Sequence, residues 1–150
     1  MSPDRPRIRV SCILYRGDQV LLVCQEKAGR GYWLLPGGGV DEGETLLRAL
    51  ARELREECGL IDLRVGEPVA IAESISPTHA ESRKHVVHVI FAAPLPSTAR
   101  PTPVDGAIRT IRLVARDELR GLDLRPPIGR FLERWRAGDP FVLLDVPWAS

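Results

Sequence analysis

Three glutamates, Glu53, Glu56 and Glu57, lie close together in a stretch of the chain rich in leucine, alanine and arginine. Because residues three and four apart meet on the surface of a helix, a helix here gathers the three carboxylates on one face. Two interpretations fit that spacing. One is a solvated acidic face beside arginines such as Arg52 and Arg55, the usual role of a run of charges. The other is a ligand set for a hard cation, since Mg²⁺ prefers oxygen ligands and commonly sits between carboxylates and substrate phosphates.

A glycine-rich segment just before this stretch favours the second interpretation. Pro36 and the three glycines at 37–39 exclude a helix before Val40, and a backbone without side chains can approach a ligand closely. The helix is expected over residues 45–60, with Gly59 in the left-handed conformation that is typical of a helix end. The apolar stripe that predicts a buried helix face consists of Leu47, Leu50, Ala51, Leu54 and Cys58.

The glycines, the helix start and the glutamates together form a pattern that resembles a known family. Gly38 is followed after five residues by Glu44, and after seven more by Arg52-Glu53-Leu54-Arg55-Glu56-Glu57-Cys58-Gly59-Leu60. This arrangement is similar to the Nudix box of the MutT-like pyrophosphohydrolases, with no departure from its pattern. The resemblance implies a hydrolase that cleaves a nucleoside diphosphate linked to another moiety. It also implies Mg²⁺ as the cofactor, with Mn²⁺ as a substitute, because a metal ion neutralises phosphate oxygens and acidifies a bound water.

The resemblance assigns roles to the charged residues of the box. Glu56 and Glu57 are expected to be the principal metal ligands. Glu53 is either a further ligand or the base that takes a proton from water. Arg52 is expected to hold a carboxylate of the box in place, since its guanidinium can bind one bidentately.

The glycine segment is expected to act through its backbone. The carbonyl of Gly37 or of Gly38 would complete the coordination of the metal, and the backbone groups of both residues would meet substrate phosphate. Glu44 is assigned to ordering the loop rather than to chemistry.

Residues outside the box complete the set of candidates. Some members of the family draw a further acid from elsewhere in the chain, and the candidates, in order of preference, are Glu81, Asp105 and Glu73. The basic side chains that could meet substrate phosphates are Arg30, Arg83 and Lys84. For each of these residues, a solvated charge is the alternative. Trp33 is interpreted as core packing, with stacking on a base as the alternative. His85 and His88 face opposite sides of a strand, so at most one of them faces the site.

Substrate identity depends on a weaker pattern. Pro77 lies 17 residues beyond Leu60, close to the position at which ADP-ribose-cleaving members often carry a proline. The resemblance therefore favours ADP-ribose or a related nucleotide sugar, and an oxidised or canonical nucleoside triphosphate is the alternative. Two further hypotheses belong to other classes: a sensing module that binds a nucleotide without cleaving it, and an interaction protein that uses only the scaffold.

Composition restricts the function further. The chain has 150 residues and a net charge of +1, which favours one compact domain over residues 1–150 and argues against nucleic-acid binding. No apolar run approaches the roughly 18 residues of a membrane span, so we expect no membrane association. Three cysteines without metal-binding spacing, and no signal-peptide core, indicate the cytoplasm. The apolar residues 141–144 suggest a homodimer contact, because many members of the family are dimers.

The remaining sequence predicts an α/β (α+β) fold. Strands come in runs rather than in regular alternation with helices; the predicted strands are 8–15, 19–25, 32–35, 62–65, 68–72, 85–93 and 107–114. A second helix is expected over 128–137, and residues 141–146 form either a last strand or an intersubunit contact. This order suits the fold that the resemblance implies, the Nudix fold, an α/β/α sandwich with a mixed central β-sheet.

Overall fold

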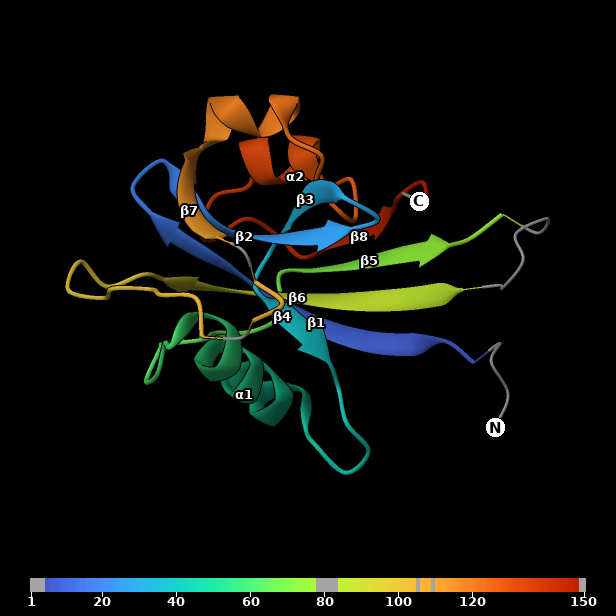
Figure 1. The fold of residues 1–150 in the computed structure, drawn as a ribbon, viewed down its shortest axis with the longest axis horizontal. Helices are drawn as coiled ribbons and strands as arrows, with labels where there is room; N and C mark the ends of the chain where they lie inside the picture. The colour runs from blue at the N-terminus through green and yellow to red at the C-terminus, as the bar shows by residue number, and fades with distance from the viewer. Residues whose placement is uncertain (1–4, 78–83, 105, 109, 149–150) are drawn as a thin grey trace.

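The computed structural model describes residues 5–77, 84–104, 106–108 and 110–148. The strands of these residues form one mixed sheet of eight, with helices on both faces (Figure 1). The strands are β1 (Arg7–Arg16), β2 (Gln19–Lys27), β3 (Arg30–Leu34), β4 (Gly37–Gly39), β5 (Ala70–Ile75), β6 (His85–Pro94), β7 (Thr110–Ala115) and β8 (Val142–Asp145). The helices are α1 (Leu46–Cys58), the 3-10 helix η1 (Arg116–Gly121) and α2 (Gly129–Arg134).

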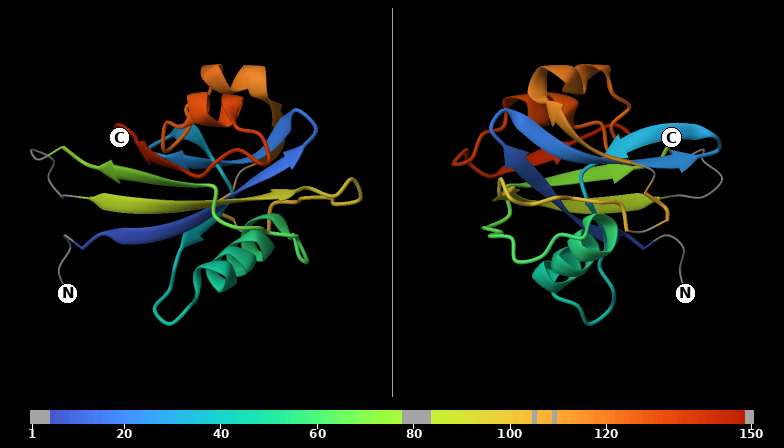
Figure 2. Two further views of the ribbon diagram at one scale, coloured as in Figure 1. Left: turned by 180° about the vertical axis from the view of Figure 1, so that it is seen from behind. Right: turned by 60° about the vertical axis from the view of Figure 1, so that its left-hand side comes forward.

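The order of the strands confirms the predicted mixed sheet. It runs β3-β2-β1-β6-β5-β8, with β4 beside β1 and β7 beside β2. The pairs β1–β6 and β5–β8 are parallel and the others are antiparallel. Helix α1 covers one face of the sheet, and η1 with α2 covers the other (Figure 2). The strand predicted over residues 85–93 is β6, an inner strand between β1 and β5.

Strands β1 and β2 begin as a hairpin and then separate. They pair only beside the turn, where Tyr15 faces Val20 and Arg16 faces Gln19. Farther from the turn, β4 takes the place beside β1, and β3 takes the place of β1 beside β2. Strand β7 pairs with the other edge of β2, starting at the turn. The cavity described below is lined by residues from both sides of this separation.

Each face of the sheet has its own apolar core, because successive side chains of a strand point to opposite faces. On the α1 side, buried members include Val10, Cys12, Leu50, Leu54 and Phe91. On the α2 side, they include Ile13, Leu22, Ile90, Leu132 and Trp135. Helix α1 buries the predicted apolar stripe only in part, since Leu47 is 54% exposed.

Three elements differ from the sequence predictions. The glycine segment is a short strand, β4, because its backbone pairs with residues 9–11 of β1. Residues 62–65 form no strand: Asp62 has a positive φ of 57°, and the apolar Leu63 and Val65 pack irregularly against the α1-side core. The second helix is shorter than predicted, since the backbone adopts an extended conformation at Trp135.

The C-terminal segment forms a strand rather than only a surface contact. Strand β8 pairs with β5, and Val142 and Leu144 pack against the α2-side core. Leu143 points to the other face and is exposed. The homodimer contact through this segment stays a prediction. None of the helices in the described parts of the chain is long and apolar enough to span a membrane.

Candidate active site

Helix α1 is fixed at both ends by its own sequence. Thr45 is the N-cap, and its hydroxyl accepts a hydrogen bond from the backbone N–H of Arg48 at 3.2 Å. Gly59 closes the helix in the left-handed region, with φ of 66°, a conformation that other residues adopt at a cost. Because Leu50, Leu54 and Cys58 are buried against the sheet, the rotation of the helix is also fixed. The predicted acidic face therefore has a defined direction.

Strand β4 lies directly against that acidic face. Glu57 is only 4% exposed, and its Oε1 accepts a hydrogen bond of 2.7 Å from the backbone N–H of Gly37. A Cβ on Gly38 would overlap the carboxyl group of Glu53. Gly38 is therefore needed because the Glu53 carboxyl group occupies the space of a side chain, whereas a Cβ on Gly37 would overlap the backbone of β1.

The strand register also orients the backbone of β4. Val10 pairs with Gly38, and the hydrogen bonds on either side of them join Cys12 to Pro36 and Val40 to Ile8. In an antiparallel pair, alternate residues direct both polar groups to the partner strand and the others direct both outward. The backbone N–H and C=O of Gly38 consequently point to β1, and those of Gly37 point to α1. Of the two carbonyls named from the sequence, the Gly37 carbonyl lies on the side of the carboxylates.

Arg52 connects the carboxylates of this region. Its guanidinium binds Glu44 bidentately, at 2.8 and 2.9 Å. The Nη1 group donates to Glu53 at 2.9 Å and to Glu56 at 3.3 Å, and Nη2 donates to the Gly39 carbonyl at 3.1 Å. The neighbouring negative charges hold the pKa of Arg52 well above its usual range. This one cation offsets the mutual repulsion of the glutamates and ties α1 to β4.

The local environment shifts the pKa values of Glu53 and Glu44, two of the glutamates that Arg52 binds, in opposite directions. Burial raises the pKa of Glu53, although Arg52 works against that shift. The hydrogen bonds from Arg52 and from the backbone of Asp41 lower the pKa of Glu44 to about 2. Glu56 is the most accessible of the three box glutamates, with 49% of its side chain exposed.

The Glu44–Arg52 pair predicts a pH-dependent stability. The pKa of Glu44 is about 2 in the folded protein against an ordinary value of 4.5. The stabilisation that ionised Glu44 gives to the folded protein is therefore complete above pH 4.5 and is lost as the pH falls towards about 2. Glu44→Gln is expected to melt at a lower temperature than the wild type at neutral pH. The difference should be modest, because the pair is only part-buried and water still screens it. Thermal denaturation of both proteins from neutral to acidic pH tests this; a gap that stays constant into the acid range contradicts it.

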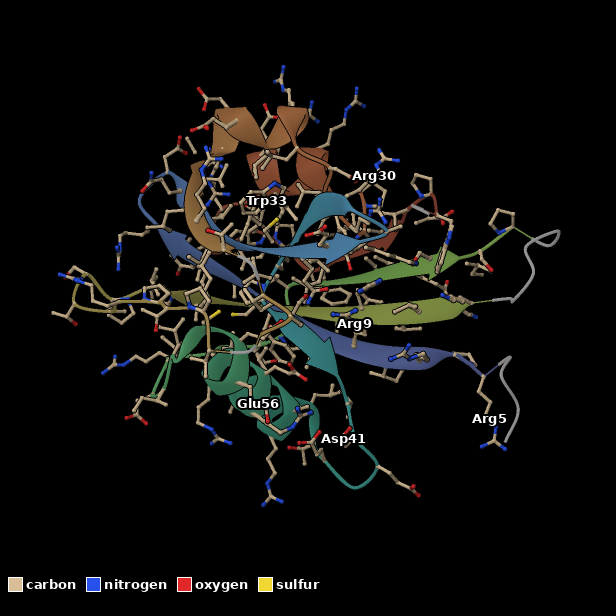
Figure 3. The ribbon with its side chains drawn as sticks, in the orientation of Figure 1. Arg5, Arg9, Arg30, Trp33, Asp41 and Glu56 are labelled. Carbon is tan, nitrogen blue, oxygen red and sulfur yellow. The ribbon has the colours of Figure 1, made fainter. Side chains whose placement is uncertain are left out.

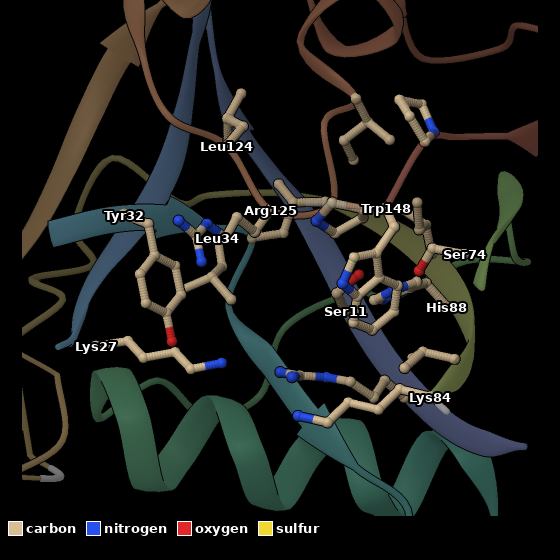
Figure 4. A pocket seen from close by; sticks show the side chains of 17 residues that line it. Ser11, Lys27, Tyr32, Leu34, Ser74, Lys84, His88, Leu124, Arg125 and Trp148 are labelled. Carbon is tan, nitrogen blue, oxygen red and sulfur yellow. The ribbon is translucent and has the colours of Figure 1, made fainter. Parts of the chain in front are cut away.

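A cavity of about 200 Å³ opens where β1 separates from β2 (Figure 4). Its lining comes from β1, β2, β3, β5 and β6, the segment before α2 and the C-terminal residues. Among the described residues, the lining contains no aspartate or glutamate, and its cationic side chains are Arg9, Lys27, Lys84 and Arg125. Arg9 belongs to both regions, because its charge acts on Glu53 as well as on His88 in the cavity. An anion could therefore extend from the cavity to the carboxylates of α1.

The two histidines of β6 lie on opposite faces, as predicted. His88 lines the cavity, and burial, reinforced by the charge of Arg9, lowers its pKa to about 4. It is therefore neutral at physiological pH. His85 lies on the other face, where its Nε2 is 2.7 Å from Glu73.

Several residues proposed from the sequence lie away from the cavity. Arg30 is exposed at the start of β3, and in Figure 3 it lies with Trp33 on the far side of the sheet from Glu56. Trp33 packs against the α2-side core with Arg112 over its ring. Neither lines the cavity, and neither does Glu73 or the exposed Pro77. The predictions for Glu81, Arg83 and Asp105 fall outside the described residues.

Other cavity residues were missed by the sequence analysis. Arg9, Lys27, Arg125 and Trp148 come from four separate segments. None of them stands in a spacing pattern with the box, so no local signal in the sequence linked them to the site. The fold alone brings them together.

Comparison with known proteins identifies the family. The chain belongs to the NUDIX domain family, whose model matches residues 5–135. It is 30% identical over 122 residues to the nucleoside triphosphatase NudI of Enterobacter sp. (strain 638), covering 77% of this chain and 86% of that protein. It is 35% identical over 88 residues to NudI of Escherichia coli O139:H28, covering 55% of this chain and 62% of that protein. The fold is similar to that of a MutT protein from Bacillus halodurans, with a TM-score of 0.77 at 20% identity over 95% of this chain and 90% of that one.

The family confirms the class expected from the box. The protein is a Nudix hydrolase of the pyrophosphohydrolase class, with the α/β/α fold and mixed sheet of that family. Nudix hydrolases generally use divalent metal ions. Within the described residues, no three His, Cys, Asp or Glu side chains already converge as a metal cluster. The donor set nevertheless fits a hard cation, because Glu53, Glu56 and Glu57 share the α1 face beside the outward carbonyl of Gly37.

Proposed function

We propose that this protein hydrolyses nucleoside triphosphates to nucleoside monophosphates and pyrophosphate with Mg²⁺. The observation that carries the proposal is the contrast between two adjacent regions. The face of α1 gathers Glu53, Glu56 and Glu57, whereas the cavity beside it presents four cationic side chains and no carboxylate among its described lining residues. A polyanion held by the cavity would place its phosphates where the carboxylates could share a metal ion with it.

Charge favours a triphosphate over ADP-ribose. The terminal phosphate of a triphosphate is not esterified, so a triphosphate carries more negative charge than ADP-ribose does. Lys27 and Lys84 add to the cationic lining that Arg9 provides, and Figure 4 shows both lysines at the cavity. This charge suits the longer polyphosphate. The NudI relatives are named as nucleoside triphosphatases, which supports the same choice. ADP-ribose remains the second candidate and rests on Pro77 alone, at its spacing from the box.

The roles follow from the contacts within the site. Glu56, Glu57 and the Gly37 carbonyl would hold Mg²⁺, with Glu53 as the remaining carboxylate. When bound, the metal ion neutralises charge on the phosphates and makes water a better nucleophile. Glu53 is the candidate proton acceptor, supported by its place against Gly38 and by the hydrogen bond with which Arg52 holds it. Arg52 bridges Glu53 and Glu56 through Nη1 and binds Glu44 through Nε.

Product analysis tests this proposal. The purified protein is incubated with Mg²⁺ or Mn²⁺ and either nucleoside triphosphates, canonical and oxidised, or ADP-ribose, and the products are separated by ion-exchange chromatography. We expect a nucleoside monophosphate and pyrophosphate from the triphosphates, with the higher kcat/KM. AMP and ribose 5-phosphate formed at a higher kcat/KM from ADP-ribose would overturn the proposal. Tight binding of every nucleotide without cleavage would favour the sensing module.

A further inference from the structure

The cavity has a wall that lies outside the part of the chain matched by the family model. That match ends at residue 135, yet Pro147 and Trp148 line the cavity. Figure 4 shows the Trp148 ring on one side of the cavity, next to His88, and Tyr32 with Arg125 on the other. The space between these walls is consequently shaped by the C-terminal segment of this particular chain.

Strand β8 holds this segment in position. It pairs in parallel with β5, and its Val142 N–H donates to the Val69 carbonyl at 3.3 Å. Val146, just after the strand, donates to the Glu73 carbonyl at 3.4 Å and packs with Leu144 against the α2-side core. The chain therefore reaches Trp148 from an anchored strand.

Trp148 differs from the other two tryptophans of the chain. Trp33 has Arg112 over its ring, and Trp135 contacts Arg116 and Tyr15. Trp148 makes no ring contact and no hydrogen bond within the part of the chain that the structure describes. Its half-buried ring lines the cavity with a free aromatic face, and a nucleobase stacks favourably on such a face.

Arg125 supplies a directed hydrogen-bond donor on the opposite wall. Its guanidinium lies 4.6 Å from the centroid of the Tyr32 ring. Nε and Nη2 donate to the carboxylate of Asp123 at 3.3 and 3.2 Å. Nη1 has no hydrogen-bond partner among the described residues. The side chain is thus held in place with one donor group unused.

We propose that Trp148 and Arg125 form a nucleobase subsite, in which the base stacks on the indole and accepts a hydrogen bond from Nη1 through a carbonyl oxygen. The site then prefers oxo bases, such as hypoxanthine, guanine and uracil, over adenine. This inference rests on the proposed function for the class of substrate. The cationic groups of the lining can only donate, and its side chains able to accept are Ser11, Tyr32, Ser74 and neutral His88. The amino group of adenine would face the Nη1 group of Arg125, and because both groups are donors, no hydrogen bond could form between them.

Inosine and adenosine triphosphates provide a matched pair, because they differ essentially at the oxygen or amino group on carbon 6. We expect the wild type to favour ITP over ATP by roughly tenfold in kcat/KM, the discrimination of one good base contact. Arg125→Met should bring this ratio close to one. A wild-type ratio near one, or a ratio unchanged in Arg125→Met, overturns the oxo-base assignment.

Trp148 is tested separately by Trp148→Ala and Trp148→Phe, with Phe141→Ala as the control for loss of an exposed aromatic residue elsewhere in the C-terminal segment. Trp148→Ala is expected to raise KM for ITP roughly tenfold with little change in kcat, whereas Trp148→Phe and Phe141→Ala stay near the wild type. An unchanged KM in Trp148→Ala overturns the stacking role. A rise of equal size in Phe141→Ala would also overturn it, since that result indicates general disturbance of the segment.

Calorimetric titration of ITP into the metal-free protein in EDTA separates this inference from the proposed function. If the wild type cleaves no triphosphate, the proposed function fails, and the subsite is judged by binding alone. Weaker binding of ITP to Trp148→Ala than to Trp148→Phe, by roughly tenfold in Kd, supports the subsite. Equal binding by the two variants, or no binding of ITP to the wild type, overturns it.

Discussion

Glu57→Gln is expected to lower kcat by more than roughly a hundredfold, since replacing even the neighbours of a metal ligand typically costs 10–100-fold. The side chain is 4% exposed, and its Oε1 accepts from Gly37 N–H at 2.7 Å. A glutamine oxygen can accept the same hydrogen bond, so the packing of α1 against β4 is kept. The negative charge that would bind Mg²⁺ is lost. Steady-state kinetics at saturating Mg²⁺ measures the effect.

A thermal melt of the same variant distinguishes lost chemistry from lost folding. The melting temperature should stay near that of the wild type, because a neutral amide costs less to bury than a carboxylate. Glu67→Gln is the matched control, since Glu67 is exposed in the segment between α1 and β5. Its kcat should equal that of the wild type. Turnover by Glu57→Gln at the rate of this control would show that Glu57 is not a metal ligand.

Gly38→Ala is expected to remove most of the activity while leaving the protein folded. The added Cβ would overlap the carboxyl group of Glu53, which is the mobile end of a flexible side chain. Glu53 can therefore move away at a small cost in stability, but it leaves the position in which Arg52 holds it at 2.9 Å. Catalytic groups depend on such positions, and a displacement of about 1 Å can cost roughly a hundredfold in rate. Kinetics and a thermal melt of the variant measure the two effects.

Gly37→Ala should instead lower the stability of the protein strongly, because its added Cβ would overlap the backbone of Val10 and Ser11. Backbone cannot rotate aside, so the pairing of β4 with β1 must open, at a cost of about 3 kcal/mol in the free energy of unfolding. Gly66→Ala is the control, since nothing lies near its Cβ position. Equal melting temperatures for Gly37→Ala and Gly66→Ala would contradict this account.

The box and its helix could be predicted from the sequence because they depend on neighbours along the chain. Thr45 caps α1, Gly59 ends it, and the spacing of Glu53, Glu56 and Glu57 places them on one face. Strand β6 was predicted by its run of apolar residues. Residues 62–65 were mistaken for a strand, because their alternation reflects packing against α1 rather than strand pairing.

The sequence by itself determined the family, the class of reaction and the carboxylates of α1, since local periodicity and helix caps act within a few residues. Only the tertiary structure decided that β4 pairs with β1, and that Gly37 rather than Gly38 turns its carbonyl to the helix. It also decided that Arg9, Arg125 and Trp148 share one cavity. These residues meet through the separation of β1 from β2 and the docking of β8. Such contacts join segments far apart in the chain, and no local pattern encodes them.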